Sequence, residues 1–246
     1  MNALTEIFRL TGKSYSDALS LVNRAGPTLF TALVILAVGD IAGIFAMRMF
    51  ASELGKTLIG TLAGIAALWF ASPYIVHLMR LLLEDQIRPG LESFSGTAVS
   101  ARFFAWSGIF AFLAAIPEFT FSLAPPGLTA ETADNPETIT LIWVTFLLLV
   151  AIWIFTARTV TLLPAVALGR DATLVQAFNH TRGRFWFVMG AAFLPILPVL
   201  IVGRLLIGGT SGVVLMGLSL VLGLILKTLA LAVSANLFRW LMENPK

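Results

Sequence analysis

Six long, mostly apolar stretches constrain this chain more than any other feature of its sequence. Each is about 20 residues long, the length that an α-helix needs to cross a hydrocarbon core about 30 Å thick. They cover residues 27–49, 58–79, 103–123, 139–163, 185–207 and 212–240. Only 12% of the 246 residues are charged, which is about half the share in a soluble domain. The sequence therefore predicts an all-α polytopic membrane protein with six transmembrane helices.

Positive charges are distributed unevenly over the segments that connect these stretches. With the N-terminus inside, 12 of the 16 Lys and Arg residues fall on the inner side and three on the outer side. Such a bias sets orientation, so we expect both termini inside. We expect one integral membrane domain over 1–246: an amphipathic inner-face segment (1–26), a six-span bundle (27–240) and an inner tail (241–246). The net charge of +3 suits inner loops that face anionic lipid and implies no nucleic-acid partner.

The segment 171–186 combines an amphipathic helix with a basic and aromatic end. Asp171 is a candidate N-cap, and apolar residues at 174, 177, 178, 181 and 185 recur at helical spacing. Gly183 then interrupts the pattern as a C-cap would. We predict a short helix in the inner interface, followed by an interfacial anchor at the depth of the lipid headgroups. The anchor residues are Arg182, Arg184, Phe185 and Trp186.

Two other segments, 14–27 and 89–108, also lead into an apolar stretch with related residues at matching positions. One interpretation is three tandem units, each an interfacial helix followed by a two-span hairpin in the same orientation. The other is that any inner segment before a span is basic and aromatic. The sequence leaves both open.

Ionisable residues inside the spans are the default functional candidates of a membrane protein. Asp40 and Lys227 lie in the first and last stretches, each about 18–20 Å from the inner end at 1.5 Å per residue. Because their depths agree, they can meet. One hypothesis is a proton, ion or substrate site; the other is a structural ion pair that joins the two spans. Glu118 and Arg204 lie near the outer ends, where snorkelling to the headgroups explains them.

The residues that usually carry metal or catalytic chemistry are scarce. The chain has no cysteine and only two histidines, His77 and His180, so we expect no metal site and no cofactor. An inner acidic cluster at 84, 85 and 92 is best interpreted as a solvated loop. Since no nucleophile, base and orienting acid can be placed in one site, we expect no catalytic residues and no enzymatic activity.

Residues 157–186 resemble a pattern of bacterial membrane proteins related to the membrane domain of membrane-anchored glycerophosphodiester phosphodiesterases, and of related uncharacterised inner-membrane families. In that pattern an Arg and a Leu-Pro-Ala element end a span, and a helix ending in Thr-Arg-Gly with an aromatic residue leads into the next. The matching residues here are Arg158, Leu163, Pro164, Ala165, Ala177, Thr181, Arg182, Gly183, Phe185 and Trp186. The resemblance implies a multi-span module of the bacterial cytoplasmic (inner) membrane. It does not imply an enzyme, because the phosphodiesterase chemistry resides in a separate soluble barrel.

Two functions are consistent with these features. The first is a non-enzymatic accessory or scaffold subunit in a membrane or envelope process, with membrane lipids and a membrane protein or a second copy as partners. The alternative is a small transporter or lipid-handling permease that uses Asp40 and Lys227.

Overall fold

The computed structural model describes residues 3–84, 98–122, 136–207 and 212–244, and all regular secondary structure in these ranges is helical. The long helices are α1 (Ala3–Met47), α2 (Glu53–Glu84), α3 (Ala98–Ser122), α4 (Pro136–Arg158) and α9 (Gly212–Glu243). The short helices are α5 (Leu162–Ala167), α6 (Leu174–His180), α7 (Phe185–Phe193) and α8 (Leu197–Ile207). Six segments are long and apolar enough to cross a membrane, with α7 and the start of α8 forming the fifth. The predicted all-α, six-span fold is confirmed.

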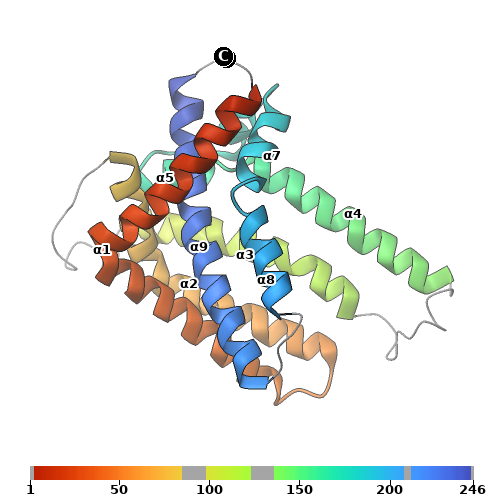
Figure 1. Cartoon of the computed structure of the whole chain (residues 1–246). Helices are drawn as coiled ribbons and strands as arrows, with labels where there is room; N and C mark the ends of the chain where they lie inside the picture. Colours follow the sequence, from red (N-terminus) through yellow and green to blue (C-terminus); the bar gives the residue numbers. More distant parts are fainter. Residues whose placement is uncertain (1–2, 85–97, 123–135, 208–211, 245–246) are drawn as a thin grey trace.

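The two described ends of the chain lie together at one end of the bundle (Figure 1). Trp240 of α9 donates a hydrogen bond from its indole Nε1 to Glu6 Oε1 of α1, at 2.9 Å. We call this end the terminal end. The opposite end, where α1 gives way to α2, is the far end.

Helix α1 contains both the predicted amphipathic segment and the first span. Its 45 residues correspond to about 68 Å at 1.5 Å per residue, more than twice the hydrocarbon core. Ala25 has non-helical dihedral angles (φ −135°, ψ 31°), and Figure 1 shows the bend. Pro27 explains it, because its ring clashes with the preceding turn. The predicted boundary between the inner-face segment (1–26) and the first span falls at this bend, but the helix does not end there and continues into the span.

The segment before the bend packs along two other spans. Leu10 is buried in a cluster with Ala191 of α7 and with Leu229, Val233 and Leu237 of α9. A polar contact accompanies this packing, because the buried Asn236 donates from Nδ2 to Asp17 Oδ2 at 2.9 Å. Burial of one helical face against two spans fixes the position of the N-terminal segment.

The fourth span ends earlier than predicted, at Arg158 instead of residue 163. After a turn, the chain forms α5, in which five of the six residues are buried. The N-cap of α6 is Thr173 and not Asp171: the Thr173 side chain accepts from Gln176 N, and the Gln176 side chain accepts from Thr173 N. Asp171 instead forms an ion pair with Arg102 of α3. Gly183 has φ +70°, as its predicted helix-ending role requires.

The fifth span is broken between α7 and α8, at residues 194–196. Pro195 and Pro198 remove two backbone N–H donors there, which explains the break. The Tyr15 hydroxyl of α1 donates to the carbonyl oxygen of Pro195 at 2.5 Å. The N-terminal helix therefore satisfies a carbonyl that lies within the break.

Three tandem units stay a prediction. Residues 85–97, which hold most of the proposed second interfacial helix, lie outside the described residues. The other two units differ in form, because the first interfacial helix continues into its span whereas α6 is separated from α7 by the turn at Gly183.

Candidate functional site: a charged cavity between the spans

Asp40 and Lys227 meet inside the bundle. The Lys227 ammonium Nζ lies 2.6 Å from Asp40 Oδ2 and donates a hydrogen bond to it. Their side chains keep 47% and 36% of their surface accessible. That the two residues meet was expected under both hypotheses, a functional site and a structural pair, and their exposure leaves both within reach of a further molecule.

The packing of α1 on α2 positions Asp40. A Cβ built on Gly39 would lie 2.2 Å from the Cβ of Ala67, so only glycine permits this approach. One turn later, a Cβ built on Gly43 would lie 3.5 Å from the Cβ of Ala63. Small residues spaced four apart allow two helix backbones to approach closely in a membrane. Because Gly39 faces α2, Asp40 is rotated about 100° away and faces α9.

A cavity of about 1000 Å³ lies next to this ion pair. Residues of α1, α2, α3 and α9 line it, together with residues at the terminal end of the fourth span and at the break in the fifth. Most of the lining is apolar, from side chains such as Leu36, Leu68 and Phe110. The volume matches the upper end of the range for small-molecule pockets, about 300–1,000 Å³.

The charged residues of the cavity gather in its far half. Asp40 is seven residues before the end of α1, or about 10 Å along the axis. Glu53 and Lys56 are in the first turn of α2 and form an ion pair at 2.5 Å. Toward the terminal end the lining carries no charge and is mostly apolar, with the buried Phe103 beside the hydroxyl-bearing Ser107 and Thr159. The cavity thus has a charged part and an apolar part, which suits an amphiphilic molecule.

Glu118 of α3 also lines the cavity and is exposed. Among the described residues, no Lys, Arg or His lies within ion-pair distance of its carboxylate. Within the described part of the chain, Asp40 and Glu53 of the cavity are therefore paired, whereas Glu118 has no such partner. The snorkelling interpretation of Glu118 stays a prediction, and the side chain of Arg204 lies outside what the structure describes.

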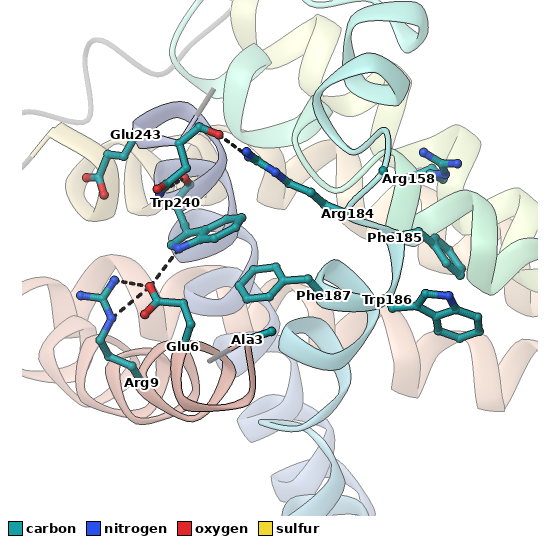
Figure 2. Close-up of a pocket in the computed structure, with 12 residues that line it drawn as sticks. Ala3, Glu6, Arg9, Arg158, Arg184, Phe185, Trp186, Phe187, Trp240 and Glu243 are labelled. Carbon is teal, nitrogen blue, oxygen red and sulfur yellow. Dashed lines mark hydrogen bonds and ion pairs between the residues drawn. The ribbon is translucent and has the colours of Figure 1, made fainter. Parts of the chain in front are cut away.

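The predicted interfacial anchor lies at the terminal end, beside a second, separate groove (Figure 2). Trp186 is 81% exposed, and Phe185 lies under the Arg158 guanidinium, 5.6 Å from ring centroid to Cζ. Arg184 lies over Trp240 at 5.3 Å. Arg182 is exposed and does not line the groove. Their role as an interfacial anchor stays a prediction.

The candidates for metal or headgroup chemistry remain apart from these sites. Within the described ranges, no group of three or more His, Cys, Asp or Glu side chains could hold a metal ion. Of the inner acidic cluster, Glu84 is the exposed last residue of α2. Asp85 and Glu92 lie outside the described residues.

Sequence reasoning missed three features that shape these sites. Gly39 and Gly43 form a small-xxx-small pattern that was readable in the sequence. The contacts of Tyr15 with Pro195 and of Trp240 with Glu6 join residues 180 and 234 positions apart, so no local pattern could reveal them.

No family model, curated protein or solved structure matches the chain. The resemblance of residues 157–186 to the phosphodiesterase membrane domains therefore stays a prediction. The functional argument rests on the two sites themselves.

Proposed function

We propose that this integral membrane protein binds a lipid-like amphiphile in the cavity and moves it between the two ends of the bundle, as a small lipid-handling permease does. The observation that carries the proposal is an accessible Asp40–Lys227 ion pair in a largely apolar cavity of about 1000 Å³. The proposed activity is binding and movement, without covalent chemistry.

The separation of the cavity lining into a charged part and an apolar part supports an amphiphilic ligand. Its apolar part offers an acyl chain or ring system an environment as apolar as a lipid tail. Its charged part offers Asp40, Lys227 and Glu118 to a polar head. An apolar cavity with a few convergent polar groups is the usual form of a ligand site.

The break in the fifth span supports movement. Ala192 of α7 and Ile196 of the break line the cavity, so a change in the angle between α7 and α8 changes its shape. Discontinuous helices line the substrate sites of many transporters. The Tyr15 contact with Pro195 links this break to the N-terminal helix.

The proposed role of the Asp40–Lys227 ion pair is tested by substitutions that remove the charge but keep the size of each side chain. Asp40→Asn, Lys227→Gln and the double variant are purified by gentle extraction, and the bound lipids and small molecules are identified by mass spectrometry. We expect one amphiphile enriched over the bulk lipid in the wild type and lost from all three variants. The matched control is Lys56→Gln, which breaks an exposed pair at the far end of the same cavity and should retain most of the ligand.

Unfolding of the same four variants separates a ligand site from a structural pair. A purely structural pair predicts that the double variant is more stable than either single variant and carries the ligand unchanged, because only the singles leave an unpaired charge. That result would refute the proposed role of the pair. A wild-type protein with no enriched amphiphile would refute the proposed function as a whole.

We also propose the cytoplasmic membrane of a bacterium as the location, with the terminal end inside. The Lys and Arg bias of the connecting segments supports this orientation. The chain has no cysteine, so a variant with one introduced cysteine has a single thiol to label. The two variants are Ser52→Cys at the far end and Glu243→Cys at the terminal end. We expect a membrane-impermeant thiol reagent to label Ser52→Cys in whole cells and Glu243→Cys only after the membrane is opened. The reverse pattern would overturn the orientation.

The exposure of α4 favours a second candidate function, that of a non-enzymatic accessory or scaffold subunit. Only 6% of the most apolar window of this span is buried, the lowest share among the six. Figure 1 shows α4 leaning away from α9. Helices in membranes bury such a face against lipid or another protein.

A photo-crosslinker distinguishes lipid from protein on this face. Placed at Leu147 of α4, which is 62% exposed, it should capture a stoichiometric membrane protein or a second copy of the chain. Placed at Leu205 of α8, which is also highly exposed, it should capture lipid. Lipid adducts alone at both positions would exclude the accessory role for α4.

A further inference from the structure

A groove of about 900 Å³ lies at the terminal end, away from the cavity. Its walls come from four parts of the chain: the start of α1, the end of α4, the start of α7 and the end of α9 (Figure 2). Phe187 and Trp240 stack at its centre, with ring centroids 4.0 Å apart. None of the residues that line it also lines the cavity.

Some of the charged side chains along the groove form ion pairs and others do not. Glu6 accepts from Arg9 Nε at 3.1 Å and from Trp240 Nε1 at 2.9 Å, so Arg9 and Glu6 neutralise each other. Arg158 and Arg184 have no carboxylate within ion-pair distance among the described residues. Glu243 also lines the groove, so its described charged residues are three arginines and two glutamates, an excess of one positive charge.

Aromatic rings and a carbonyl hold the two arginines in place. Arg158 lies over Phe185 and Arg184 over Trp240, and Arg184 Nη1 also donates to the carbonyl oxygen of Asn244 (Figure 2). Stacking uses the face of a guanidinium and leaves its edge, with further N–H donors, for an anion. A fixed guanidinium edge is the arrangement that binds the oxygens of a phosphate.

We propose that this groove binds the phosphate-bearing headgroup of a membrane lipid, with Arg184 and Arg158 as its phosphate-binding residues. The site goes beyond the proposed function and does not depend on it. Basic pockets between transmembrane helices bind lipid headgroups. The 81% exposed Trp186 beside the groove marks the depth at which headgroups lie, because tryptophan concentrates at the membrane interface.

Soluble phosphate has the same chemistry as the headgroup, so the experiment includes both. The purified full chain in detergent is titrated with phosphatidylglycerol and, separately, with a galactosyl diacylglycerol of the same acyl chains that has no phosphate. Bound lipid is counted by native mass spectrometry, and inorganic phosphate is added as a competitor. We expect phosphatidylglycerol to bind more tightly than the galactolipid and to resist displacement by inorganic phosphate.

Substitutions locate the binding. Arg184→Gln and Arg158→Gln should each weaken phosphatidylglycerol binding about tenfold, because a charged hydrogen bond is lost. The matched control is Arg170→Gln: Arg170 also lies over an aromatic ring, Phe238, at 5.7 Å, but does not line the groove. Unfolding midpoints show whether each variant is folded. Arg184→Lys, which keeps the charge but loses the planar fork, provides a milder variant with an expected intermediate loss.

Three results would overturn the proposal. Equal binding of the two lipids would show that phosphate is not recognised. An equal loss in Arg170→Gln would show that general positive charge, and not the groove, attracts the lipid. Complete displacement by inorganic phosphate would assign the groove to a soluble anion. Asp40→Asn should leave this binding unchanged, which separates it from the cavity.

Discussion

The contact between α1 and α2 at Gly39 yields the most quantitative prediction. Gly39→Ala adds a single methyl group that would lie 2.2 Å from the Ala67 Cβ. Carbon atoms in contact lie about 3.5–4.0 Å apart, so the helices must separate locally by about 1.3 Å or more. Both methyl carbons are attached directly to the backbone, and therefore no rotamer change relieves the clash.

We expect Gly39→Ala to lower the free energy of unfolding by about 1–3 kcal/mol, the usual cost of overpacking a core. This loss overcomes the gain of up to about 1 kcal/mol that alanine brings to a helix. For a chain of this length, each kcal/mol corresponds to about 2–4 °C in the unfolding midpoint. The measurement is thermal unfolding of the purified protein in one detergent.

Two companion variants test the reasoning. Gly64→Ala, on α2, adds its methyl group where nothing lies within 4 Å, so it should be neutral or stabilising by up to about 1 kcal/mol. Ala67→Gly combined with Gly39→Ala moves the methyl group from one helix to the other and should restore most of the stability. If Gly39→Ala behaves like Gly64→Ala, the close approach is incorrect, and the positioning of Asp40 argued from it is refuted.

Three further substitutions test other contacts. Tyr15→Phe removes the donor to the Pro195 carbonyl and should cost about 1 kcal/mol in thermal unfolding; unchanged stability would show that the contact does not fix the break. Thr173→Ala removes the capping box of α6 and should cost about 1 kcal/mol, seen as faster hydrogen exchange in α6 alone. Exchange as slow as in the wild type would contradict the capping role. Asp171→Asn should change stability by less than about 0.5 kcal/mol, because its pair with Arg102 is largely exposed; a larger loss would mean that this pair anchors α3.

The sequence carried enough information for the spans and for much of their detail. Crossing a membrane requires about 20 apolar residues in a helix that satisfies its own backbone hydrogen bonds, so length and hydropathy alone predicted six spans. Local chemistry also explains the interruptions: Pro27 bends α1, and Pro195 and Pro198 lie at the break in the fifth span. These outcomes depend on a residue and its immediate neighbours.

The predictions that were wrong concern positions where the local sequence is compatible with more than one structure. Asp171 and Thr173 are both good N-cap residues, but α6 begins at Leu174, so Thr173 caps it and Asp171 pairs with Arg102 of another helix. The fourth span continues in hydropathy to residue 163, but the chain turns after Arg158 because α5 is buried against other helices. Hydropathy measures transfer into an apolar environment and does not distinguish lipid from protein interior.

By itself, the sequence determined that the chain spans a membrane six times and that Asp40 and Lys227 lie at matching depth. Only the tertiary structure decided that the two meet beside an open cavity, that Glu118 faces the same space, and that Arg158 and Arg184 line a separate groove. The reason is physical. Depth follows from counting residues along one helix, whereas the rotation and neighbours of each helix depend on side-chain packing between segments as far apart as Tyr15 and Pro195.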